Sequence, residues 1–129
     1  MAQPTQKLKV IGRIGDVYIH QKEGGIKYYS IGSPNARKIS RDTVEGRILA
    51  ELLDNTDKLF DYQRLCEIGR TKAISASYGL FNLRLINSRS RYFRLAEQGK
   101  GKSLVLRLEF ASPPQEYIAD LERTDEALG

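Results

Sequence analysis

The spacing of apolar residues changes along the chain, and this change fixes the order of strands and helices that the chain can form. The first two apolar stretches, at 7–20 and 26–33, are rich in Val, Ile and Tyr and contain no Pro. They flank a Glu-Gly-Gly corner at 23–25, where glycine tolerates positive φ. The pattern therefore predicts a β-hairpin, with Gly12 and Gly15 marking a bend or a second turn.

A helical period follows the loop at 33–37 and predicts a first helix from Thr43 to Asp54. Asp42 is the expected N-cap, because Glu45 stands three residues later in the spacing of a capping box. Five apolar residues share one side of this helix: Val44, Ile48, Leu49, Leu52 and Leu53. We therefore expect an amphipathic helix that packs against the core.

A second, shorter helix is predicted from Tyr62 to Gly69. Asp61 stands in the position of its N-cap, and Gly69 marks its end. Its inward-facing side chains are expected to be Leu65, Cys66 and Ile68.

A third helix is predicted to run from the polar residues at 71–77 to about Asn87. It has apolar residues on two nearly opposite sides: Ala76, Leu80 and Leu83 on one, and Ile74, Tyr78, Phe81 and Leu85 on the other. Such a helix either packs between two surfaces or leaves one apolar side exposed for contact with a partner. A strand that starts near Phe81 is the alternative, because residues 81–86 also alternate in polarity and Gly79 weakens a helix.

Two alternating strands, at 91–97 and 103–110, predict a second β-hairpin. The turn between them contains two glycines and the lysines Lys100 and Lys102, so this hairpin has a cationic tip.

A short tail helix is expected after the hairpin. Ser112 is its candidate N-cap and Pro113 its first helical residue. We therefore expect one folded domain at 1–111, followed by an acidic tail helix at 112–129.

Positive charge is concentrated in the middle of the chain. The 129 residues include 21 Lys and Arg against 16 Asp and Glu, a net charge of +5. Residues 64–107 alone have 10 basic and two acidic residues, a charge of +8, whereas residues 1–63 carry +2 and residues 108–129 carry −5. We therefore expect the middle third to bind an anionic partner.

Composition excludes several classes of protein. One Cys and one His exclude a disulfide framework and any zinc site with several Cys or His ligands. No stretch has the roughly 18 apolar residues of a membrane span, and the start lacks the apolar core of a signal peptide. Phosphate-loop, nucleophile-elbow and zinc-protease motifs are absent from the sequence. We expect a cytoplasmic protein that is not an enzyme and has no cofactor or metal.

The order of a small sheet, a core helix, a short helix, a longer helix and a basic hairpin resembles the winged helix-turn-helix, most closely the OmpR/PhoB-type effector domain. The stretch ISRDTVEGRILAELLDN, at 39–55, looks like that family's first helix. The Leu-Arg pair in SASYGLFNLRLINS, at 75–88, stands where the family often has Leu-Arg near the end of its recognition helix.

This resemblance covers about residues 10–110 and implies an α+β fold. Its expected parts are an N-terminal antiparallel sheet, three helices, a hairpin wing and the short tail helix. It also implies a DNA-binding regulator of transcription. The family's closing Gly-x-Gly-Tyr is absent, and 129 residues leave no room for its receiver domain, so control by phosphorylation is not expected.

The winged-helix arrangement gives contact roles to polar residues of the middle third. A helix fits the major groove of duplex DNA, and a basic hairpin reaches the adjacent backbone. Phosphate contacts are expected from Arg70, Lys72, Ser75 and Ser77. Base or backbone contacts are expected from Tyr78, Asn82 and Arg84. A clamp on the wing side is expected from Arg89, Arg91, Lys100 and Lys102. If about five phosphates are neutralised, log affinity should fall with log salt at a slope of about −4 to −5.

Two other functions fit the sequence. The third helix would bind a protein partner through its exposed apolar face, formed by Tyr78, Phe81 and Leu85. That face or the acidic tail would also serve as the contact of a homodimer. A β-rich domain would instead bind RNA or single strands by stacking bases on four aromatic rings: Tyr28, Tyr29, Tyr92 and Phe93.

The remaining polar residues have simpler interpretations. His20 is expected to be an exposed or hydrogen-bonded strand residue, and Cys66 a small core residue. Three aspartates are expected to cap helices or face solvent rather than bind a metal: Asp54, Asp57 and Asp61.

Overall fold

The computed structural model describes residues 8–74, 85–99, 101–111 and 115 of the chain. These residues form a mixed α+β structure with two antiparallel sheets, which confirms the expected fold class. The first sheet contains, in spatial order, β1 (Lys9–Ile14), β2 (Val17–Gln21), β3 (Lys27–Ile31) and β4 (Ile39–Ser40). The second sheet contains, in spatial order, β5 (Phe60–Asp61), β7 (Val105–Phe110) and β6 (Phe93–Gln98).

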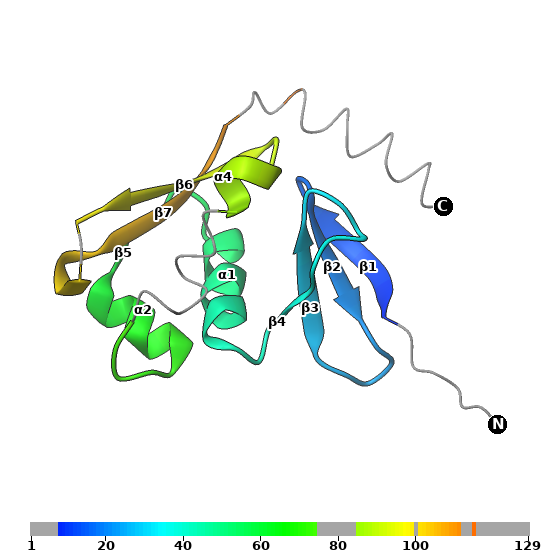
Figure 1. Cartoon of the computed structure of the whole chain (residues 1–129), viewed down its shortest axis with the longest axis horizontal. Helices are drawn as coiled ribbons and strands as arrows, with labels where there is room; N and C mark the ends of the chain where they lie inside the picture. The colour runs from blue at the N-terminus through cyan, green and yellow to red at the C-terminus, as the bar shows by residue number, and fades with distance from the viewer. Residues whose placement is uncertain (1–7, 75–84, 100, 112–114, 116–129) are drawn as a thin grey trace.

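Helices lie between and beside these sheets (Figure 1). They are α1 (Val44–Asp54), α2 (Tyr62–Gly69), α4 (Leu85–Arg89) and the short 3-10 turn η1 (Gly101–Ser103). The bounds of α2 agree with the prediction, and α1 begins one residue later than predicted. Of the predicted third helix, the described part is α4, which continues to Arg89 instead of ending near Asn87. Residues 85 and 86 are therefore helical, while 75–84 lie outside the described residues. Of the predicted tail helix only Gln115 is described, and it is helical.

The N-cap of α1 is Thr43, so the prediction of Asp42 is wrong. The Thr43 hydroxyl accepts a hydrogen bond of 3.0 Å from the Gly46 amide. Asp42 stands one residue too early to reach that amide, and its carboxylate lies 3.6 Å from the Arg47 guanidinium instead. The predicted cap of α2 is confirmed, because the Asp61 carboxylate accepts a 2.8 Å bond from the Arg64 amide.

One hydrophobic core joins the two sheets through α1, which lies between them (Figure 1). The predicted apolar side of α1 is confirmed, since Ile48, Leu49 and Leu52 are fully buried. The core also includes side chains from both sheets and from α2 and α4: Val17, Tyr29, Ile31, Leu65, Ile86, Phe93, Leu106 and Leu108. No helix within the described ranges has the length and hydrophobicity that crossing a bilayer requires.

Glycines shape the first sheet at the two predicted positions. The register of β1 on β2 shifts between Val10 and Gly12, as expected for a β-bulge. Gly15 forms the β1–β2 turn at φ 59°, and a Cβ there would meet the Phe93 ring at 2.5 Å. The turn therefore needs glycine both for its backbone angle and for close approach to the second sheet.

The buried Asp16 carboxylate connects the first sheet to the start of β6. One of its oxygens accepts a 2.6 Å bond from the Ser90 hydroxyl, and the other accepts a 2.6 Å bond from the Arg91 amide. The Asp16 carbonyl also accepts from the Gly32 amide at 2.8 Å, which ties in the end of β3. The two bonds to the carboxylate and the one to the carbonyl together hold β3, the β1–β2 turn and the start of β6 in fixed relative positions.

Gly46, in the first turn of α1, packs closely against the backbone of Ser40 and Arg41, and a substitution there tests this contact. Ala is favoured over Gly inside a helix by about 1 kcal/mol. A Cβ on Gly46, however, would overlap the Ser40 carbonyl and crowd Arg41, and backbone atoms do not yield cheaply. We predict that Gly46→Ala lowers the free energy of unfolding by about 2 kcal/mol. The matched control is Gly12→Ala, whose Cβ would meet nothing within 4 Å. Equal midpoints for the two variants in urea would contradict this prediction.

Candidate nucleic-acid interface

The end of α2 presents two exposed cations just before the predicted contact helix. Arg70 caps α2 in the left-handed conformation, at φ 57° and ψ 48°. Its amide donates to the Glu67 carbonyl at 3.2 Å, and the next amide, of Thr71, donates to the Cys66 carbonyl at 3.1 Å. Arg70 and Lys72 are both exposed, and neither forms an ion pair with another described residue. Backbone hydrogen bonds therefore hold this turn in place, while its two cationic side chains are exposed to solvent.

The chain is anchored to the core on both sides of residues 75–84. Before them, Ile74 is buried, and its amide donates to the Tyr62 hydroxyl at 3.1 Å. After them, Ile86 is fully buried, and the Asn87 side chain both accepts from the Leu95 amide at 2.7 Å and donates to the Leu95 carbonyl at 3.1 Å. The flanks of the predicted contact helix are thus fixed to α2 on one side and to β6 on the other.

The predicted hairpin is confirmed, and its tip lies beside α2. β6 pairs with β7 from Phe93↔Phe110 to Gln98↔Val105. η1 follows the hairpin turn and contacts α2, while Asp61, the N-cap of α2, pairs with Val105 of β7. Lys102 in η1 is exposed. It therefore lies near the N-terminal end of α2, while Arg70 lies at the C-terminal end.

Arg89 and Arg91, which were grouped with Lys102 as one clamp from the sequence, lie at the other end of the hairpin from Lys102. Both precede β6, whereas Lys102 follows it, and a six-residue strand is roughly 20 Å long. Arg91 is exposed, its guanidinium lies 5.5 Å from the centre of the Tyr92 ring, and its amide is held by Asp16. The structure therefore places Arg89 and Arg91 at the base of the hairpin, beside the first sheet, and Lys102 at its tip.

Carboxylates of the chain neutralise part of the basic middle third. Glu109 pairs with Arg94 of the neighbouring strand at 2.6 Å and with Arg107 at 2.9 Å. These two arginines, with the hydrogen bond from Arg94 as the largest cause, lower the pKa of the Glu109 carboxyl. Arg64 pairs in the same way with Glu67 at 3.4 Å.

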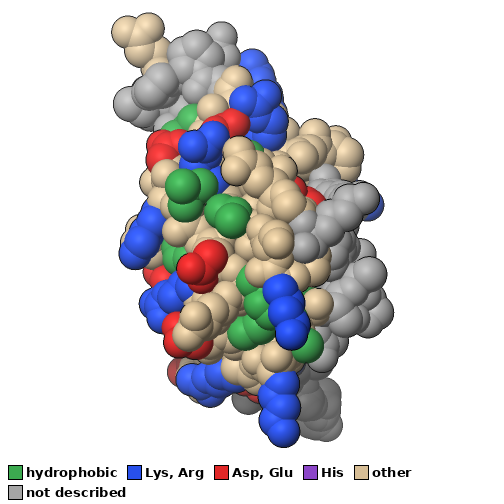
Figure 2. Space-filling model, turned by 90° about the vertical axis from the view of Figure 1, so that its left-hand side faces the viewer, with side chains coloured by type: hydrophobic (Ala, Val, Ile, Leu, Met, Phe, Trp, Pro, Cys, Tyr) green, Lys and Arg blue, Asp and Glu red, His purple; other side chains and the backbone are tan. Residues whose placement is uncertain are grey.

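The face that includes α2 and the hairpin is therefore of mixed charge. Figure 2 views the molecule from this side and shows basic, acidic and hydrophobic side chains interspersed. The basic middle third therefore does not form a uniformly positive surface, and the candidate contacts are the exposed cations left outside these pairs.

The other predicted contact residues lie outside the described part of the chain. They are Ser75, Ser77, Tyr78, Asn82, Arg84 and Lys100. The same holds for Phe81 and for the side chain of Leu85, which were expected on the apolar face for a protein partner.

Burial contradicts the stacking of single-stranded nucleic acid on three of the four predicted rings. Tyr29, Tyr92 and Phe93 are at most 5% exposed and belong to the hydrophobic core, and Tyr28 is half-buried. A base needs an open ring face, so the three buried rings have a packing role.

The structure assigns simple roles to the remaining polar residues. Cys66 is half-buried at the edge of the core, and Asp61 caps α2 as predicted. Asp54 and Asp57 are exposed, and the described residues contain no group of three or more metal-ligating side chains. His20 is buried, and its Nε2 lies 2.7 Å from the Ser30 hydroxyl, which agrees with the predicted hydrogen-bonded strand residue.

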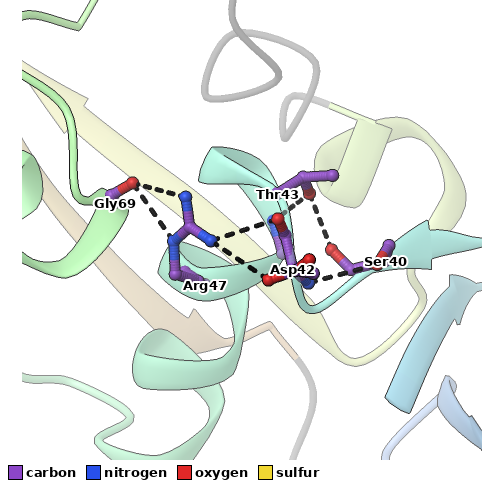
Figure 3. Close-up of polar contacts among 6 residues, drawn as sticks. Ser40, Asp42, Thr43, Arg47 and Gly69 are labelled. Atoms are coloured by element: carbon purple, nitrogen blue, oxygen red, sulfur yellow. Dashed lines mark hydrogen bonds and ion pairs between the residues drawn. The ribbon is translucent and has the colours of Figure 1, made fainter. Parts of the chain in front are cut away.

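Sequence analysis missed Arg47, which connects α1 to the end of α2 (Figure 3). It lines a polar groove of about 600 Å³ together with Arg41, Arg64, Arg70 and several carboxylates. Its guanidinium donates to the Gly69 carbonyl, 22 positions away in sequence. In the sequence Arg47 is one more polar residue on the outer side of an amphipathic helix, so no local pattern marks it.

Comparisons of the chain with models of protein families, with curated proteins and with solved structures gave no match.

Burial of His20 makes stability depend on pH. Desolvation, and secondarily the charge of Lys38, lower the pKa of His20 below its ordinary value. In the unfolded chain His titrates at about 6.5, so the unfolded state gains a proton first as the pH falls. The free energy of unfolding is therefore not reduced by His20 above about pH 6.5. It falls as the pH drops from there towards the pKa of His20 in the folded state.

We therefore predict that the melting temperature falls between pH 7.5 and pH 5.5, and that His20→Gln reduces this fall. Ser30→Ala, which keeps the histidine, should still show it. The prediction fails if the wild type and His20→Gln lose the same number of degrees over this interval.

Proposed function

We propose that this protein binds double-stranded DNA and acts as a non-enzymatic regulator of transcription. The observation that carries the proposal is the set of exposed cations at the end of α2 and at the hairpin tip, together with the anchored residues on either side of 75–84. Arg70 and Lys72 lead into residues 75–84 from α2, and Lys102 lies on the hairpin tip beside α2.

The order of elements supports the same proposal. A four-stranded sheet precedes α1, and β5 between α1 and α2 joins the β6–β7 hairpin in one sheet. This order is similar to the winged helix-turn-helix that the sequence resembles. In that arrangement the helix before the hairpin enters the major groove and the hairpin contacts the adjacent backbone.

The spacing of the cations also suits a duplex. Arg70 and Lys102 lie near opposite ends of α2, whose eight residues span about 12 Å. The major groove of B-DNA is about 12 Å wide, so cations near the two ends of a helix of this length are able to contact phosphates on both of its sides. Such contacts hold the protein on the backbone and carry no sequence information.

Salt dependence of binding tests these contacts directly. For the wild type, about five neutralised phosphates give a slope of log affinity against log salt of about −4 to −5 on random duplex. We predict that Arg70→Ala combined with Lys72→Ala makes this slope shallower by about 1.8, because each lost phosphate contact contributes about 0.9. Fluorescence anisotropy over a range of salt concentrations measures both slopes.

The matched control is Lys9→Ala combined with Arg37→Ala. It removes the same charge from two exposed residues of the N-terminal half, one in β1 and one in the loop after β3. We expect a slope close to that of the wild type for this variant. Equal weak binding to duplex, single-stranded DNA and RNA, or equal slopes for both double variants, would reject the proposal.

A further inference from the structure

Arg47 lines the same polar groove as Arg70 and bonds to Gly69, the residue that precedes Arg70. We infer that Arg47 is a positioning residue for DNA binding, because it holds the end of α2 in the geometry from which Arg70 and Lys72 reach the phosphates. The inference rests on the proposed function and adds a residue that acts through others.

All three nitrogens of the Arg47 guanidinium are occupied within the protein (Figure 3). Nε and Nη2 donate to the Gly69 carbonyl at 3.1 and 2.8 Å. Nη1 donates to the Asp42 carbonyl at 3.1 Å and lies 3.6 Å from the Asp42 carboxylate. Its side chain is 22% exposed, so these contacts are partly shielded from water. Three of the five N–H groups of this guanidinium are therefore used within the protein.

The carbonyl that Arg47 binds is at the end of α2, where helical carbonyls lack partners in the helix. A cation there also complements the helix dipole. Gly69 is buried against α1, since a Cβ on it would lie 3.0 Å from Val44 Cγ1. The residue that follows it, Arg70, has a left-handed backbone conformation. Arg47 therefore fixes the last ordinary helical residue before the backbone changes direction.

A fixed turn lowers the entropy that binding must remove. Arg70 is not a glycine, and its left-handed conformation is unfavourable unless the surroundings hold it. Without the Gly69 contact the turn samples other conformations in the free protein and must be ordered on binding. Ordering one residue corresponds to about a tenfold loss of affinity. The bound state keeps the same phosphate contacts, so the salt slope should not change.

Two substitutions of Arg47 separate this role from a direct contact. Arg47→Met keeps the length of the side chain and removes the guanidinium, while Arg47→Lys keeps the charge and loses the planar fork. We expect duplex affinity about tenfold lower for Arg47→Met, with the slope unchanged, and a loss in the same direction for Arg47→Lys. Arg64→Met is the matched control, because Arg64 lies on α2, is exposed and pairs with Glu67; its affinity should change little.

The decisive measurement is Arg47→Met in the Arg70→Ala, Lys72→Ala background. If Arg47 acts through these two cations, Arg47→Met reduces duplex affinity much less in the double variant than in the wild type. Amide exchange gives an independent readout, because Arg47→Met should lower the protection of the Arg70 and Thr71 amides, which are bonded to carbonyls of α2.

The outcomes distinguish this inference from the function on which it rests. If the wild type shows no salt-dependent duplex binding, both are wrong. If the Arg70→Ala, Lys72→Ala variant binds more weakly and Arg47→Met does not, only the positioning role is wrong. If the affinity losses of Arg47→Met and of the double variant add up, and Arg47→Met makes the salt slope shallower by about 0.9, then Arg47 contacts a phosphate directly and the inference is wrong. If Arg47→Met fails to fold, Arg47→Lys carries the test, and unchanged affinity with unchanged amide protection rejects the role.

Discussion

The burial of α1 between the two sheets is the constraint on which the rest of the structure depends. Ile48, Leu49 and Leu52 are fully buried and share one core with residues of both sheets. Hydrophobic burial of this kind is the dominant favourable term in folding. Neither sheet covers its own inner face, and each therefore needs this helix. The position of the hairpin relative to the first sheet follows from their common contact with α1.

Apolar packing is non-directional, and a few polar contacts define how the packed parts are oriented. Asp16 joins the first sheet to the residues before β6, and Asn87 joins α4 to β6. Arg47 joins α1 to the end of α2. Each contact joins a charged or amide side chain to a backbone group of another segment. A buried backbone group that loses its partner costs about 1–3 kcal/mol. Together they fix the backbone on either side of residues 75–84.

Folding also decides which cations remain able to bind a polyanion. The excess of basic residues at 64–107 is a property of the sequence. In the folded chain Arg94 and Arg107 share Glu109, which lies just outside that segment, and Arg64 pairs within α2. Exposed Arg and Lys side chains at the end of α2 and at the hairpin tip stay outside these pairs. The candidate interface is therefore smaller than the charge count suggests and is located around α2.

The sequence by itself determined the local elements, because their signals lie within a few residues. The Asp61 cap, the apolar side of α1 and the glycine-rich turn of the last hairpin were all predicted correctly. Asp42 was predicted as the cap of α1 because Glu45 follows it at the capping-box spacing, but the helix begins one residue later, so that Thr43 is the cap. The burial of Tyr29, Tyr92 and Phe93 and the bond from Arg47 to Gly69 were decided by the tertiary structure alone. Each depends on residues far apart in sequence that packing brings together, and a pattern read over one turn or one strand contains no information about such contacts.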